Sequence, residues 1–188
     1  MRQLQVKKNK EIGFSIIELL ISITIISILA AAIYGVFISI SRASTVQNAS
    51  AGAQQNVRGG LELIVQDIRM AGYNPNQIPN LAPIEIAESN KIRIKSDRNE
   101  NGVIDNTDFE IITYKLVNNQ LRRILYEGTL SEARHTIIEN VTGLQFSYSG
   151  PNNSIVILEL SVEENSGFGR SVSRTLRTCI YCRNLGGN

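Results

Sequence analysis

The chain has 188 residues, of which 43% are hydrophobic and 19% are charged. This length supports one globular domain of modest size and one long additional element, but not two full domains. The formal net charge is only +2 and the basic residues are spread along the chain, so nucleic acid is not an expected partner.

Residues 1–13, MRQLQVKKNKEIG, form a short basic leader in front of a long apolar segment. The basic residues of the leader are Arg2, Lys7, Lys8 and Lys10. The next basic residue along the chain is Arg42, beyond the apolar segment. Because positive charge favours the cytoplasmic side of a membrane, we expect the N-terminus in the cytoplasm and the rest of the chain outside it.

The apolar segment runs for 27 residues from Phe14 to Ile40 and holds a single charged residue, Glu18. As a helix it would be about 40 Å long, more than the roughly 30 Å of hydrocarbon in a bilayer. A cleavable secretory signal, suggested by the small residues 30–32, and a plain signal anchor are the simpler interpretations. Neither explains Glu18, because an ionised acid within the bilayer costs on the order of 2–3 kcal/mol unless it is paired.

The segment Gly13 to Leu29, GFSIIELLISITIISIL, resembles the leader junction and N-terminal segment of type IV pilins and type II secretion pseudopilins. The resemblance implies that a prepilin peptidase cleaves after Gly13 and that the new N-terminal residue, Phe14, is N-methylated. Glu18 matches the glutamate at the family's fifth mature position. Cleavage gives Phe14 a positive α-amino group, which Glu18 of a neighbouring subunit can neutralise inside an assembled filament.

Apolar residues recur at spacings of three and four from Val46 to Ile68, which marks one face of a helix. We therefore expect one long helix over residues 14–72, with a membrane or filament-core half over 14–40. The part from Val57 onward is expected to pack on the protein's own sheet, and the part before it to be free for neighbouring subunits. The sequence Gly59-Gly60 suggests a bend or close packing.

Residues 73–188 are predicted to form a β-rich head with about six strands, mostly antiparallel, because short runs of alternating apolar residues replace the helical spacing. The predicted strands are Lys91–Lys95, Phe109–Leu116, Gln120–Tyr126, Leu144–Tyr148, Ile155–Val162 and Ser171–Tyr181. A long helix packed on an antiparallel sheet is an α+β arrangement, and it is the pilin fold that the resemblance implies. Segments 66–73, 141–148 and 183–185 most resemble a PilW-type minor pilin or a J-type pseudopilin.

A calcium-loop pattern begins at the end of the first predicted strand, with oxygen-bearing side chains at loop positions one, three, five and nine and glycine at six. The predicted ligands are Asp97, Asn99, Asn101, the Val103 carbonyl, Asp105 and Asp108. Asp108 stands where this pattern usually has glutamate, which weakens the expected affinity. The alternative is a metal-free hairpin turn at Asn101-Gly102, where both residue types tolerate positive φ. No other cofactor is expected.

Cys179 and Cys182 form a CxxC pair near the C-terminus. Outside the cytoplasm a disulfide is favoured over a reactive dithiol. Unrelated thiols and half of a zinc site are the alternatives, but the chain has no second cysteine pair and His135 is its only histidine.

No nucleophile motif and no glycine-rich phosphate loop is found in the sequence, so the chain is not expected to be an enzyme. We expect a minor pilin or pseudopilin that anchors in the bacterial inner membrane and then joins a pilus or pseudopilus. The resemblance implies prepilin peptidase, other pilins or pseudopilins, an inner-membrane assembly platform and membrane lipid as partners. The alternatives are a type II secretion pseudopilin at the tip and a membrane-anchored extracytoplasmic binding domain.

Overall fold

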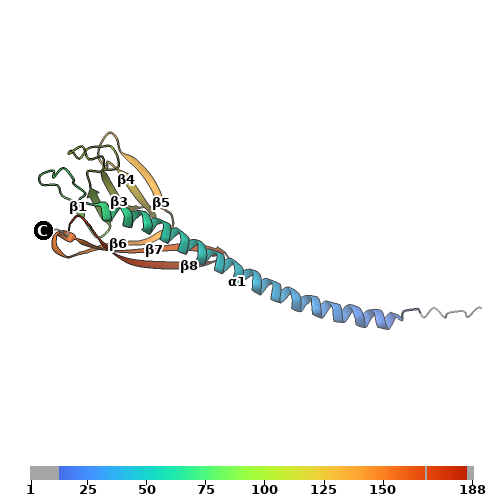
Figure 1. Ribbon diagram of the computed structural model, residues 1–188. Coiled ribbons are helices and arrows are strands. Elements are labelled where there is room, and N and C mark those ends of the chain that lie inside the picture. The colour runs from blue at the N-terminus through green and yellow to red at the C-terminus, as the bar shows by residue number, and fades with distance from the viewer. Residues whose placement is uncertain (1–12, 168, 186–188) are drawn as a thin grey trace, which may run out of the picture. The chain divides into compact units, whose positions relative to one another are not determined.

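The computed structural model describes residues 13–167 and 169–185 of the chain (Figure 1). Of the leader predicted over 1–13, only Gly13 lies within the described residues. The chain divides into two compact units, Met1–Ser44 and Thr45–Asn188. One helix, α1 (Ile16–Met70), begins in the first unit and ends in the second, which agrees closely with the long helix predicted over 14–72.

The first unit contains the apolar half of α1, which is long and apolar enough to cross a membrane. Three of its hydroxyl side chains form hydrogen bonds within the helix: Ser22, Thr24 and Ser27 each donate to the carbonyl four residues earlier, at 2.7–2.8 Å. These hydrogen bonds lower the cost of placing hydroxyl groups in an apolar surrounding. The segment therefore suits a lipid or protein environment without water.

The second unit contains the rest of α1 and, within its described residues, two antiparallel sheets. The first has the order β1-β2-β3-β4-β5 and the second the order β6-β7-β8. The strands of the first sheet are β1 (Ile84–Ala87), β2 (Lys91–Lys95), β3 (Ile111–Val117), β4 (Gln120–Leu125) and β5 (Ala133–Ile138). Those of the second are β6 (Val141–Ser149), β7 (Ile155–Gly167) and β8 (Arg170–Tyr181), with a short 3-10 helix at Pro151–Asn153. The α+β pilin-like arrangement is thus confirmed.

One hydrophobic core joins the second half of α1 to both sheets. The helix contributes fully buried side chains at three- and four-residue spacing, and β7 contributes every second residue from Val156 to Val162. The helix residues with no exposed surface are Ala53, Val57, Ile64 and Ile68. Apolar residues three or four apart line one side of a helix, and apolar residues two apart line one face of a strand. These two apolar surfaces can pack against each other, so the spacing of apolar residues in the sequence explains the core.

The hairpin of β7 and β8 is longer than predicted, and the expectation that helix packing starts only at Val57 is wrong. Arg174 of β8 donates to the Ser50 hydroxyl at 2.5 Å, and Asn56 of α1 donates to Glu164 of β7 at 3.1 Å. Ala53 is already fully buried. Polar residues near the hairpin tip interrupt the alternating apolar pattern but not the strand pairing. The pattern in the sequence therefore underestimated the length of the hairpin.

Gly60 accounts for the closest approach of α1 to β5. A Cβ atom at this position would lie 2.1 Å from Cδ1 of Ile138, whereas a Cβ at Gly59 would meet nothing within 4 Å. Close packing is therefore confirmed at Gly60, where an added side chain would require the Ile138 side chain to shift.

A carboxylate just after β4 forms ion pairs with three basic side chains of the strands β2 and β3. Glu127 lies 3.0 Å from Lys91, 2.7 Å from Arg93 and 2.5 Å from Lys115. Burial by itself raises the pKa of Glu127, but the hydrogen bonds from Lys115, Arg93 and Lys91 outweigh it and lower the pKa to about 2. The group is therefore ionised in the folded protein at all but very acidic pH.

This cluster predicts a pH-dependent loss of stability. A glutamate in an unfolded chain has a pKa of about 4.3, so the lower folded-state pKa of Glu127 stabilises the fold above that pH. The stabilisation should disappear as the pH falls from about 5 to about 2. We expect the melting temperature of the wild type to fall more steeply over this range than that of Glu127→Gln. Parallel melting curves for the two proteins would contradict the prediction.

Candidate functional site

Glu18 lies in the first turn of α1, beside the position where the mature chain is predicted to begin. The backbone N–H of Ser15 donates to Oε2 of Glu18 at 3.1 Å. A serine followed three residues later by glutamate is the capping-box pattern, and this hydrogen bond is the half of it that the glutamate makes; a carboxylate also complements the positive end of the helix dipole. Glu18 thus has a capping role that the sequence analysis missed, although the pattern Ser-Ile-Ile-Glu displays it.

The geometry also bears on the predicted charge pair of Glu18 and Phe14. Ser15 directly follows Phe14, so the carboxylate contacts the nitrogen next to the one that cleavage after Gly13 would free. A helix that starts here holds an acid close to its own mature N-terminus. The same carboxylate is exposed and open to the N-terminus of another subunit.

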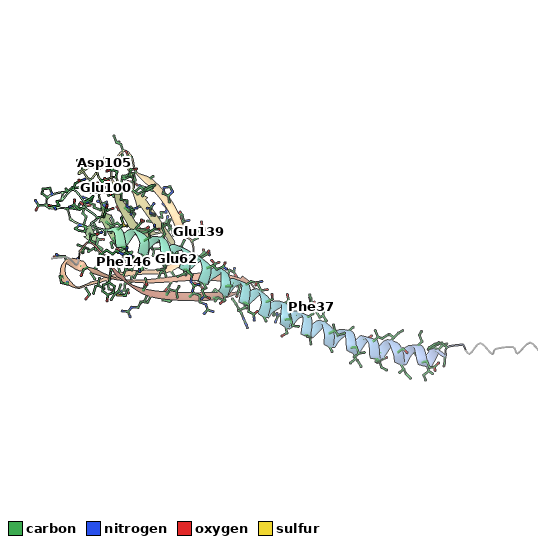
Figure 2. All side chains as sticks on the ribbon, in the orientation of Figure 1. Phe37, Glu62, Glu100, Asp105, Glu139 and Phe146 are labelled. Carbon is green, nitrogen blue, oxygen red and sulfur yellow. The ribbon has the colours of Figure 1, made fainter. Side chains whose placement is uncertain are left out.

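The apolar half of α1 presents its side chains outward on all sides, as Figure 2 shows for Phe37. Sixteen large apolar side chains between Phe14 and Ile40 are each more than half exposed. Burying a side chain of this size is worth about 1.5–3 kcal/mol, so covering them all would yield on the order of 25–50 kcal/mol. That free energy is available from lipid or from neighbouring helices.

The loop between β2 and β3 is folded around the side chains predicted to bind calcium. Asp97 is fully buried, and its carboxylate accepts the backbone N–H groups of Asn101 and Gly102, both at 3.1 Å. The side-chain oxygen of Asn101 accepts the N–H of Val103 at 2.8 Å, and that of Asp105 accepts the N–H of Thr107 at 2.8 Å. The predicted ligands are therefore brought together in one loop.

Asn101-Gly102 does not form a two-residue turn here, because the loop that joins the antiparallel strands β2 and β3 is longer. A metal-free hairpin connection stays the alternative to a calcium site. Gly102 has φ of 80°, but the preceding positive φ, 61°, belongs to Glu100 and not to Asn101. The Asn99 amide donates to Asp108 at 3.2 Å, and the Asn101 amide donates to Asp105 at 3.3 Å. Both amides would have to turn to offer oxygen to a cation.

Glu110 is a part of the loop that the sequence analysis missed. It is fully buried and accepts the N–H of Arg98 at 3.1 Å and that of Asp105 at 2.9 Å. Within the described residues, no group of three or more His, Cys, Asp or Glu side chains is placed to hold a metal ion. A calcium site would depend on amide and carbonyl oxygens as well as carboxylates, and it stays a prediction.

Asp67 connects α1 to this loop and to the first sheet. Its buried carboxylate accepts hydrogen bonds from Arg98 at 2.8 Å, Arg123 at 2.8 Å and the Tyr114 hydroxyl at 2.6 Å. Burial and the adjacent carboxylate of Asp67 raise the pKa of Tyr114, so the hydroxyl stays a donor. An acid next to Ile68 on the apolar face of the helix was the sequence signal for this site.

The two cysteines lie at the end of β8 and are free thiols in the structure. Cys179 is exposed, whereas Cys182 is buried, and burial raises the pKa of the Cys182 thiol to about 11. A disulfide between them stays a prediction. His135 is exposed on β5, as expected for a surface histidine.

Two matches to known families cover most of the chain. Residues 8–34 match the prokaryotic N-terminal methylation motif, and residues 47–181 match the family described as prepilin peptidase-dependent protein B. The chain belongs to the prepilin peptidase-dependent protein B family. No curated protein and no solved structure gives a significant match.

Membership of the prepilin peptidase-dependent protein B family confirms the resemblance to type IV pilins. The protein is minor pilin-like and structural, not enzymatic, and its partners include prepilin peptidase and pilin-type proteins. The methylation motif overlaps both the leader junction and the exposed apolar half of α1. The family match and the exposed apolar side chains thus both place the candidate functional site in the N-terminal part of the chain.

Proposed function

We propose that the protein is a minor pilin that takes part in the assembly of a type IV pilus-like filament. The observation that carries this proposal is the exposed apolar half of α1, with Glu18 the acidic residue of its first turn. Prepilin peptidase cleaves after Gly13 and methylates Phe14. The mature helix then leaves the inner membrane with the help of an assembly platform and joins a core of related helices in a pilus or pseudopilus.

Two charged groups would favour the transfer of the mature helix from the membrane to the filament. In lipid, the free α-amino group of Phe14 and the carboxylate of Glu18 are both costly. In a filament core, each can pair with its counterpart on a neighbouring subunit, so assembly removes two unfavourable charges at once. Before assembly, the capping interaction with Ser15 keeps Glu18 at the helix start and near the membrane surface.

Processing at Gly13 is the most direct test. We expect intact and peptide mass spectrometry to show a peptidase-dependent product that begins at Phe14 and carries one added methyl group. Gly13→Ala should slow cleavage and Gly13→Val should abolish it, because a side chain obstructs the approach of the peptidase to the backbone.

Gly35→Ala is the matched control for these variants. This glycine lies in the apolar half of α1, far along the chain from the cut, and has no neighbour within 4 Å of an added Cβ, so its replacement should leave processing unchanged. An uncut chain, or a cut beyond Ala32, would contradict the proposal and favour a membrane-anchored binding domain. A type II secretion pseudopilin would show the same processing, but its deletion would impair secretion and not piliation.

Calcium binding by the loop between β2 and β3 is a separate proposal, supported by the position of Asp105 in the fold of that loop (Figure 2). We expect the melting temperature to be higher in calcium than in EDTA, because a ligand of the folded state at 100 times its Kd adds about 2.7 kcal/mol. Asp105→Asn keeps an oxygen for the Thr107 N–H but loses the charge, so it should respond less. Equal melting temperatures in calcium and EDTA would contradict the proposal.

A further inference from the structure

A groove of about 520 Å³ runs between the second half of α1 and strand β8. Its apolar lining includes Leu61 and Val65 of the helix and Leu176 of the strand. Among the described strands, β8 pairs with β7 alone and forms the outer edge of its sheet. The groove therefore lies beside an open sheet edge, where another element can be added without displacing any described one.

The rim of this groove carries an excess of positive charge. Arg58, Arg69 and Arg183 line it, and Glu62, labelled on α1 in Figure 2, is its only acidic residue within the described part of the chain. None of the three arginines forms an ion pair with a described residue, in contrast to Arg93 of the first sheet. An apolar floor with unpaired arginines on its rim complements an apolar surface bordered by carboxylates.

We propose that this groove docks an acidic amphipathic helix from a different filament subunit. The helical wall from Arg58 to Met70 is about 18 Å long, which matches roughly three turns of a partner helix. Apolar residues at three- and four-residue spacing on the partner would cover Leu61 and Leu176, while Asp or Glu residues beside them would pair with the arginines. The inference rests on the proposed filament function.

A second copy of this chain is the less suitable occupant. Two identical grooves brought face to face would place Arg58 and Arg69 against the same arginines, with only Glu62 on each side to offset them. Like charges at an interface select against a partner. The charge pattern thus favours a heterotypic contact over self-association.

The proposal can be tested with the photo-crosslinking residue p-benzoyl-phenylalanine placed at Gln66, an exposed position that lines the groove. The full chain is expressed in its own host, and the crosslinked peptide is identified by mass spectrometry. We expect the peptide to come from a helix of another pilin-type subunit with acids at three- or four-residue spacing. Arg58→Glu combined with Arg69→Glu should lower the crosslinked fraction by about tenfold or more.

The control is Arg177→Glu, which makes the charge change of one of these two substitutions on β8 but outside the groove. It should leave the crosslinked fraction unchanged. Exchanging the partner's acids for arginine should restore crosslinking to the double variant, which a folding defect would not allow.

A crosslink to a second copy of this chain or to lipid, no crosslink, or equal crosslinking in the double variant would each overturn the proposal. The N-terminus of the same samples is determined by mass spectrometry. A chain that begins at Phe14 but gives no such crosslink refutes the docking site alone. A chain that is not cut after Gly13 refutes the filament function.

Discussion

Replacing Asp67 with alanine is expected to lower the free energy of unfolding of the head by about 3–5 kcal/mol. The carboxylate is buried and holds Arg98, Arg123 and the Tyr114 hydroxyl. Its removal leaves the Tyr114 hydroxyl and two guanidinium groups without this partner, which costs far more than the net worth of the ion pairs. Guanidinium unfolding of the full chain in mild detergent, followed by circular dichroism, measures the effect.

Two milder variants separate charge from hydrogen bonding at this position. Tyr114→Phe removes one hydrogen bond and should cost about 1–1.5 kcal/mol. Asp67→Asn keeps an oxygen acceptor but loses the charge, so its effect should fall between those of Tyr114→Phe and Asp67→Ala. If Asp67→Ala unfolds at the same denaturant concentration as the wild type, Asp67 does not connect the helix to the sheet as inferred.

Replacing Glu18 with alanine is expected to reduce incorporation into filaments by at least about 30-fold, since an unpaired buried charge costs about 2 kcal/mol or more. Cleavage after Gly13 should continue, because the acid lies beyond the residues that flank the cut. The ratio of this subunit in sheared filaments to that in membranes, measured by quantitative mass spectrometry, gives the effect. The N-terminus is determined in the same samples to exclude failed processing.

Glu18→Gln distinguishes the two roles that the structure and the sequence give this residue. Glutamine keeps an oxygen that can accept the Ser15 N–H, so the capping box survives while the charge is lost. If the charge pair drives assembly, glutamine should be as defective as alanine. Wild-type incorporation of the glutamine variant would show that helix capping is what matters, and would contradict the proposed charge pairing.

Local patterns in the sequence predicted the long helix and most strands. The ends of α1 follow from the polar leader and from Gly72, and β2 alternates over its length, whereas β3 and β4 alternate only in part. Strands β1 and β5 were missed. β1 has only four residues, and β5 carries Arg134, His135 and Thr136 in succession. Both are outer strands of their sheet. Each is held there by pairing with one neighbouring strand, and its sequence has no clear alternation of apolar residues.

The residues of the candidate site also differ in whether the sequence alone could predict them. The roles of Gly13, Phe14 and Glu18 could be predicted because the pattern that suggests them lies within a few neighbouring positions. Asp67 and Glu110 were not, because their partners are contributed by distant segments that only the fold brings together. A single acid on an apolar helix face signals a buried partner, but it does not identify the partner.

The three partners of Asp67 come from three separate segments, the loop after β2, strand β3 and strand β4. In the proposed filament, tension would pull on each subunit through its helix, and this carboxylate is one of the contacts through which the force would pass from helix to sheet. Because the three bonds converge on one side chain, they would share the load and have to break together. Asp67 would then act as a mechanical clamp whose strength matters under force, beyond its contribution to equilibrium stability.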